Sequence, residues 1–182
     1  MTISEWAASY AAGVVSPLGD RWRHVQGVAR QAERVAAILP ADDRDLLLAA
    51  AYLHDLGYAP SLARTGLHSL DGARHLRALG HERLAGLVAY HSAARVEAAL
   101  RGLAVELADF EDEASATSMA LTYCDMNTGV TGEAVTLAER LADVERRYGA
   151  GHVVTRSVRQ ARHEIERCIE FVETSLRGTA AS

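Results

Sequence analysis

The sequence contains no lysine: all 19 of its basic residues are arginine. A lysine nucleophile, base or Schiff base is therefore excluded from any mechanism. Cysteine is also scarce. The two present, Cys124 and Cys168, are far apart, so the chain has no disulfide framework and the expected setting is a reducing compartment, the cytoplasm.

Long apolar runs are missing as well. None approaches the ~18–20 residues that cross a bilayer, and the first residues lack a basic segment and include Glu5, which makes a signal peptide a poor interpretation. We therefore expect no membrane partner. The formal net charge is −5 and no basic stripe is present. No nucleic acid polymer is expected as a partner, whereas a small phosphorylated molecule held by a few arginines fits the composition.

Composition and pattern together predict a globular helical protein. The 182 residues are 49% hydrophobic and 24% charged, which suits one domain with a real core. No run of alternating apolar and polar residues is bounded by turns, so strands are not expected. The fold class is predicted to be all-α, a single-domain globular bundle of about eight helices. Apolar spacing and breakers place the helices at 3–15, 21–39, 42–54, 69–79, 82–91, 96–110 with a break near Gly102, 117–126, 133–148 and 153–176. The tail, 178–182, is expected to fray.

The chemistry centres on the stretch 49–57, AAAYLHDLG. Its alanines and Leu53 predict the buried end of a helix, with Gly57 as the helix stop. The stretch thereby carries His54 and Asp55 toward the interior, where ionisable groups need compensation. A metal cation is one compensation, and a half-exposed helix end is the alternative.

Other histidines lie at element boundaries or beside apolar stripes. His24 falls in the first turns of its helix, His68 precedes one, and His91 closes another. Asp125 ends a segment that reads as buried, and its carboxylate faces the negative end of a helix dipole. A cation or a nearby arginine would offset it. The remaining histidines lie in surface-like contexts: His75, His81, His152 and His163.

These residues carry a family resemblance. His24, then His54-Asp55, then Asp125 resembles the H…HD…D pattern of the HD-domain metal-dependent phosphohydrolase superfamily. His68 in HSLDGA and His91 in AYHSAAR match the extra ligands of dinuclear members. The resemblance covers about 21–129 and implies one HD-type domain over 1–182, with the C-terminal helices of 131–177 packing on the motif-bearing core.

The resemblance implies a dinuclear centre. One metal would take His24, His54, Asp55 and Asp125, and the other His68 and His91, with Asp55 as the bridge. Two cations ~3.5–4 Å apart need such a carboxylate between them. Imidazole ligands favour iron, manganese, zinc, cobalt or nickel over magnesium or calcium. No organic cofactor is expected.

The implied reaction is hydrolysis of a small phosphoester or nucleotide by a metal-activated water, as a phosphomonoesterase or phosphodiesterase. Asp55 would be catalytic as the bridge. Arg95, four residues beyond His91, is the first candidate for a catalytic, phosphate-binding arginine, provided that the helix continues, and Arg64 is the second. Tyr58 is a further substrate-binding candidate. It stands where cyclic-dinucleotide phosphodiesterases of the superfamily carry lysine, which argues against that substrate.

Two alternatives share the ligand pattern. A minority of HD proteins are di-iron oxygenases, here acting on a small phosphonate or polyol. A non-catalytic, nucleotide-binding HD domain would keep the ligands for stability. The sequence leaves the metal, the substrate and the oligomeric state open, a homodimer included.

Overall fold

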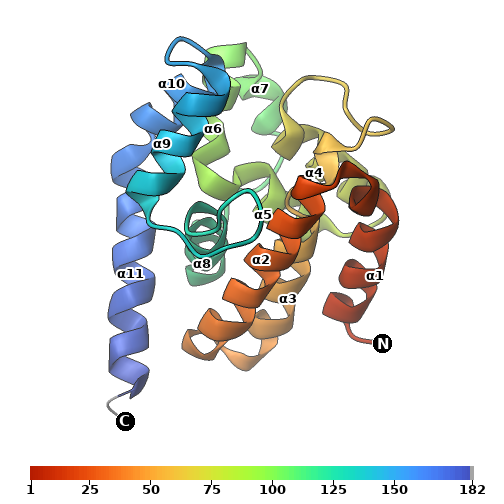
Figure 1. Cartoon of the computed structure of the whole chain (residues 1–182). Coiled ribbons are helices and arrows are strands. Elements are labelled where there is room, and N and C mark those ends of the chain that lie inside the picture. Colours follow the sequence, from red (N-terminus) through yellow and green to blue (C-terminus); the bar gives the residue numbers. More distant parts are fainter. Residues whose placement is uncertain (181–182) are drawn as a thin grey trace.

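The computed structural model describes residues 1–180, and these form helices without a strand (Figure 1). The prediction of an all-α fold is therefore confirmed. Residues 181 and 182 of the tail lie outside the described part. None of the described helices is both long and apolar enough to cross a membrane. The α-helices are α1 (Ile3–Val15), α2 (Asp20–Val35), α3 (Ala41–Leu53), α4 (His68–Ala78), α5 (Glu82–Tyr90), α6 (Ala94–Arg101), α7 (Ala104–Leu107), α8 (Ala116–Met126), α9 (Leu137–Tyr148), α10 (Val153–Gln160) and α11 (Arg162–Ala180).

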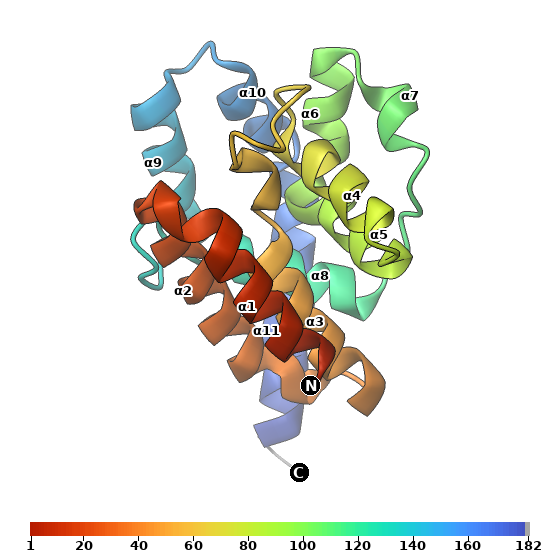
Figure 2. The ribbon, with the colours of Figure 1, turned by 90° about the vertical axis from the view of Figure 1, so that its right-hand side faces the viewer.

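Helix α8 lies at the centre, as its apolar composition predicts. It packs against α2, α3, α5 and α11, and Ala120, Leu121 and Cys124 are completely buried. Helices α2 and α3 run side by side, with α1 laid across α3 on the other side (Figures 1 and 2). The core around these helices includes Leu47 and Leu53, neither of which is exposed at all.

Several helix boundaries differ from the sequence expectation, and local hydrogen bonds give the reason. Helix α9 begins at Leu137 rather than near Glu133, because the Thr136 hydroxyl and the Glu139 carboxylate form a capping box there. The expected helix 153–176 is two helices that part at Ala161, and α11 continues to Ala180. The break near Gly102 is confirmed, since Gly102 has a φ of 74° and ends α6.

The helices beyond α8 fold back over one end of the molecule. Helix α10 packs against both α6 and α9. In both views α9 and α10 lie at the same end as α6 and the loop that follows α3 (Figures 1 and 2). This arrangement places a pair of C-terminal helices opposite the His54-Asp55 stretch.

Candidate metal centre

Helix α3 delivers His54 and Asp55 into the interior. The helix ends at Leu53, and the two side chains that follow are 0% and 2% exposed. A short 3-10 turn, Leu56–Tyr58, comes next. The sequence expectation of a buried His-Asp pair at this helix end is confirmed.

Gly57 has a different role from the predicted one. Helix α3 has already ended four residues earlier, so its interpretation as a helix stop is wrong. A Cβ at Gly57 would lie 1.9 Å from the carbonyl oxygen of His68 and 2.8 Å from the amide nitrogen of Gly72. Glycine thus lets the turn approach the first residues of α4. This contact brings His68 next to Asp55.

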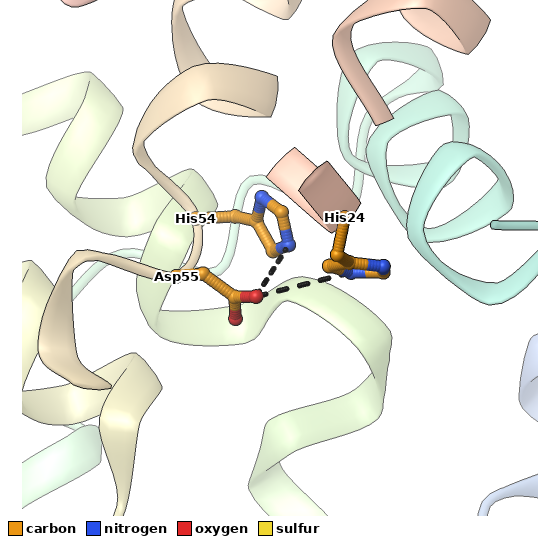
Figure 3. Close-up of side chains that lie close together, drawn as sticks. All are labelled: His24, His54 and Asp55. Carbon is orange, nitrogen blue, oxygen red and sulfur yellow. Dashed lines mark ion pairs between the residues drawn. The ribbon is translucent and has the colours of Figure 1, made fainter. Parts of the chain in front are cut away.

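Asp55 lies between two groups of histidines. Its Oδ2 atom is 3.3 Å from Nε2 of His54 and 3.8 Å from Nε2 of His24 (Figure 3). Its Oδ1 atom is 3.4 Å from Nε2 of His68, and that nitrogen lies 3.2 Å from Nε2 of His91. Either group, His24 with His54 and Asp55 or Asp55 with His68 and His91, is compact enough to hold a metal ion. The structure therefore brings together the residues that the sequence pattern selected, with Asp55 common to both groups.

Backbone carbonyls fix the rings of three of these histidines. Nδ1 of His24 lies 2.9 Å from the Gly129 oxygen, Nδ1 of His54 2.8 Å from that of Ala51, and Nδ1 of His91 2.6 Å from that of Val88. A carbonyl oxygen only accepts, so each Nδ1 carries the proton and donates it. When such a ring is neutral, its lone pair is on Nε2, which is the atom that faces the cluster. Imidazoles that bind metals are oriented in this way.

Asp125 joins the group from the end of α8. Its Oδ1 atom is 3.0 Å from Nε2 of His24 and 3.5 Å from Nη2 of Arg140, and the Ser92 hydroxyl donates to Oδ2. Arginine is thus part of what offsets the carboxylate at this helix end. Asp125 is oriented toward the centre by neighbours on both sides.

The residues fit a divalent transition metal. Nε2 of His54 is buried and has no hydrogen-bond partner, although Oδ2 of Asp55 is near. A buried polar atom without a partner is costly unless a ligand satisfies it. Nitrogen and carboxylate donors in this number suit iron, manganese, zinc, cobalt or nickel.

The acid–base properties of the cluster also suit cation binding. Burial by itself raises the pKa of Asp55, but the Arg21 guanidinium and the neighbouring imidazoles outweigh burial and hold that pKa well below its usual range. Burial lowers the pKa of His68 to about 3 and also lowers the pKa of His91. At His54 burial is outweighed by Asp55, and the pKa is raised. An anionic Asp55 beside the neutral rings of His68 and His91 is the protonation state that metal ions require, whereas at His54 a metal ion would have to displace the proton that the raised pKa favours.

The expectation that Arg95 faces the cluster is wrong. It assumed that the helix continues past His91, but Ser92 and Ala93 adopt left-handed φ values of 52° and 57°. The chain turns there, and α6 starts in a new direction at Ala94. The Arg95 guanidinium forms an ion pair with Glu164 on α11 and is 54% exposed.

Arg64 is also turned away from the cluster. Its side chain is exposed and donates to the carbonyl oxygens of Ser61 and Ala63. Tyr58, in contrast, lines the same cavity as Asp55, His68 and His91, and it stacks on the His68 ring with 4.2 Å between centroids. Of the three candidate substrate-binding residues, Tyr58 is the one in a position to meet a ligand.

Three arginines that the sequence did not single out line this cavity: Arg21, Arg140 and Arg147. Nη1 of Arg21 lies 2.8 Å from Oδ2 of Asp55, and its guanidinium covers the Tyr58 ring at 3.9 Å. Arg140 on α9 faces Asp125. Arg21 precedes His24 by three residues, and this helical spacing puts both on one face of α2. For Arg140 no local signal exists, because its position depends on how α9 folds back.

Comparison with known families supports the geometry. The HD domain family matches residues 21–120, more than half of the chain. The chain belongs to the HD-domain family. Comparison with curated proteins and with solved structures found no significant match. HD domains are mostly metal-dependent phosphohydrolases that bind divalent metals, and the two groups around Asp55 fit this property. Helices α9 to α11 lie beyond the matched residues.

Proposed function

We propose that this HD domain is a metal-dependent phosphohydrolase that cleaves a small phosphoester or nucleotide. The observation that carries the proposal is the position of Asp55, whose two oxygens face different histidine groups. A carboxylate in this position is what a pair of divalent cations needs between them. His24, His54, Asp55 and Asp125 would hold one cation, and His68, His91 and Asp55 the other.

The metal pair, when bound, supplies a nucleophilic water at neutral pH and withdraws charge from the phosphoryl oxygens. The protein supplies the geometry. Arg21 holds the Asp55 carboxylate through a 2.8 Å contact, and the carbonyl-bound Nδ1 atoms hold the rings of His24, His54 and His91. A site fixed in advance loses little free energy to reorganisation during the reaction.

Arg140 takes the phosphate-binding role that the sequence assigned to Arg95. Arg140 is buried among the residues that line the cavity and carries a permanent charge in a fork geometry that matches phosphate oxygens. Arg21 is neutralised by Asp55, so it acts on the bridge rather than on the substrate. Tyr58, stacked on His68, closes one side of the cluster.

The test combines metal analysis with turnover. The purified protein is chelated and reloaded with Mn²⁺, Fe²⁺, Zn²⁺, Co²⁺ or Ni²⁺, and phosphate release is measured from a panel of phosphoesters. We expect release that requires metal. Asp55→Asn keeps the shape of the bridge and removes its charge, so release should fall by at least about 100-fold, whereas Asp42→Asn, exposed at the start of α3, should have no effect.

Two outcomes would contradict the proposal. One is phosphate release that persists at the full rate after chelation. The other is an iron-loaded protein that consumes O₂ with a small substrate and releases no phosphate from any ester, which would establish the oxygenase alternative instead.

A further inference from the structure

The cavity above the metal centre has two chemically different sides. Asp55, His68 and His91 lie on one side. Residues from α9 and α10 form the other, and this side is largely apolar. Its members are Val144, Tyr148, Val154 and Val158, with Met126 beside them. We call these five residues the apolar wall. All five lie beyond the segment that matches the HD family.

The polar groups near the apolar wall already have partners within the protein. The Glu97 carboxylate accepts from Nε of Arg101 at 2.7 Å, and the Ser157 hydroxyl donates to the Val154 carbonyl at 2.8 Å. Nε of Arg147 lies 2.9 Å from the Asp143 carboxylate. This side of the cavity therefore offers a ligand apolar contact area and few free hydrogen-bonding groups.

Arg140 is different. Its side chain is 9% exposed, and its Nε and Nη1 atoms are buried with no hydrogen-bond partner. Among the described residues that line the cavity, it is the one whose buried side-chain nitrogens lack a partner. Buried donors without acceptors are costly, and a guanidinium offers two parallel donors to a phosphate-like group. An anionic acceptor bound next to the metal centre would satisfy these donors of Arg140.

We infer that the cavity binds a phosphomonoester whose organic group is apolar. This inference rests on the proposed function for its phosphoryl site. Arg140 binds a non-bridging phosphoryl oxygen, and the organic group lies against the apolar wall. Two divalent cations together with Arg21 and Arg140 outweigh the charges of Asp55 and Asp125, so a doubly charged monoester matches the cavity better than a singly charged diester.

Binding of non-hydrolysable analogues tests the inference without turnover. Phenylphosphonate and methylphosphonate are titrated calorimetrically into the Mn²⁺-loaded protein at pH 8. Burial of the phenyl group should make phenylphosphonate bind at least about tenfold more tightly. The monomethyl ester of phenylphosphonate, which carries one charge less, should bind more weakly than phenylphosphonate.

The role of Arg140 is tested with matched variants. Arg140→Gln should weaken both phosphonates by a similar factor, about tenfold or more, because the lost contact is to the group that they share. Arg140→Lys keeps a charge near Asp125 and should give a smaller loss with unchanged metal content, which separates ligand binding from folding. Arg146→Gln, on the same helix but 74% exposed, is the control and should change neither affinity.

The apolar wall is tested separately. Val158→Asn should lower the preference for phenylphosphonate over methylphosphonate severalfold and leave methylphosphonate binding unchanged, because that small ligand does not reach the wall. Val105→Asn, at a position that is 80% exposed on α7, is the control.

Equal affinities for the two phosphonates, within about twofold, would overturn the inference, and so would an Arg140→Gln variant that binds like the unmodified protein. These outcomes differ from a failure of the proposed function. If the protein shows the expected binding pattern but releases no phosphate from phenyl phosphate, the binding inference holds and the proposed hydrolase function is wrong. If it hydrolyses phenyl and methyl phosphate equally well, the hydrolase function holds and the inference about the organic group is wrong.

Discussion

At the scale of single residues, the candidate metal centre depends on the second nitrogen of each ring. In His24, His54 and His91, Nδ1 donates a hydrogen bond to a backbone carbonyl, so that Nε2 faces the cluster. The carbonyls belong to different segments of the chain, so the rings are held independently of one another. Removal of one ring should therefore leave the others in place, and its effect on metal binding can be measured in a folded protein.

His54→Ala provides that measurement. Because outer-shell partners of a metal ligand are already worth about 10–100-fold in affinity, loss of the ligand itself should weaken metal binding at least about 100-fold. Metal content after gel filtration, measured by mass spectrometry, should fall while the far-ultraviolet circular dichroism stays helical. His163→Ala, whose ring is 99% exposed, serves as the control. Full metal occupancy in His54→Ala would refute the ligand assignment.

At the scale of elements, the turn after α3 and the start of α4 must touch. Gly57 lies against the carbonyl of His68 and the amide of Gly72, where a Cβ has no room. Asp71 strengthens the same region by accepting from the backbone amides of Arg64 and Thr65, which ties the loop to α4. The position of His68 beside Asp55 is thus set by packing of backbone on backbone.

Gly57→Ala should disturb this packing. Overfilling of a tight contact typically lowers the free energy of unfolding by about 1–3 kcal/mol, and displacement of His68 should reduce metal binding by the His68–His91 group. Gly13→Ala is the matched control, because Gly13 lies within α1 with open space around its Cα. There the exchange should raise the free energy of unfolding by about 0.5–1 kcal/mol. Urea titration and metal analysis measure both effects, and an unchanged Gly57→Ala variant would contradict the role of this contact.

The sequence alone predicts most of the helices but not every change of direction between them. Apolar spacing and breakers located most of the helices, because these signals are local. The residues of the cluster are far apart in the sequence, and the resemblance to HD domains is what grouped them. The change of direction at Ser92 and Ala93 carries no glycine or proline to announce it, so Arg95 was placed on the wrong side. Arg140 reaches Asp125 only through the return of α9, a long-range event without a local pattern.

At the scale of the whole molecule, the cluster joins distant parts of the chain. His24 on α2 and Asp125 at the end of α8 are separated by 101 positions, and the other residues of the cluster come from the end of α3, the start of α4 and the end of α5. A cation bound here contacts several elements of the fold at once. Metal binding and global stability should therefore be linked.

Calorimetric unfolding tests this link. A ligand present at 100 times its dissociation constant adds about 2.7 kcal/mol to the stability of the folded state. For a chain of this size that corresponds to a rise in Tm of about 5–10 °C. The Tm should accordingly rise with Mn²⁺ and fall with a chelator, and the difference should shrink in His54→Ala. Identical Tm values with and without metal would rule out a cluster that contributes to folding.

The apolar wall lies entirely outside the segment that matches the HD family, whereas His24, His54, Asp55, His68 and His91 lie inside it. Under the proposed function, the metal centre and the surface that selects the organic group would therefore come from different portions of the polypeptide. Replacement of α9 and α10 by another helical hairpin would then change which substrates are accepted and leave the proposed metal-binding residues unchanged.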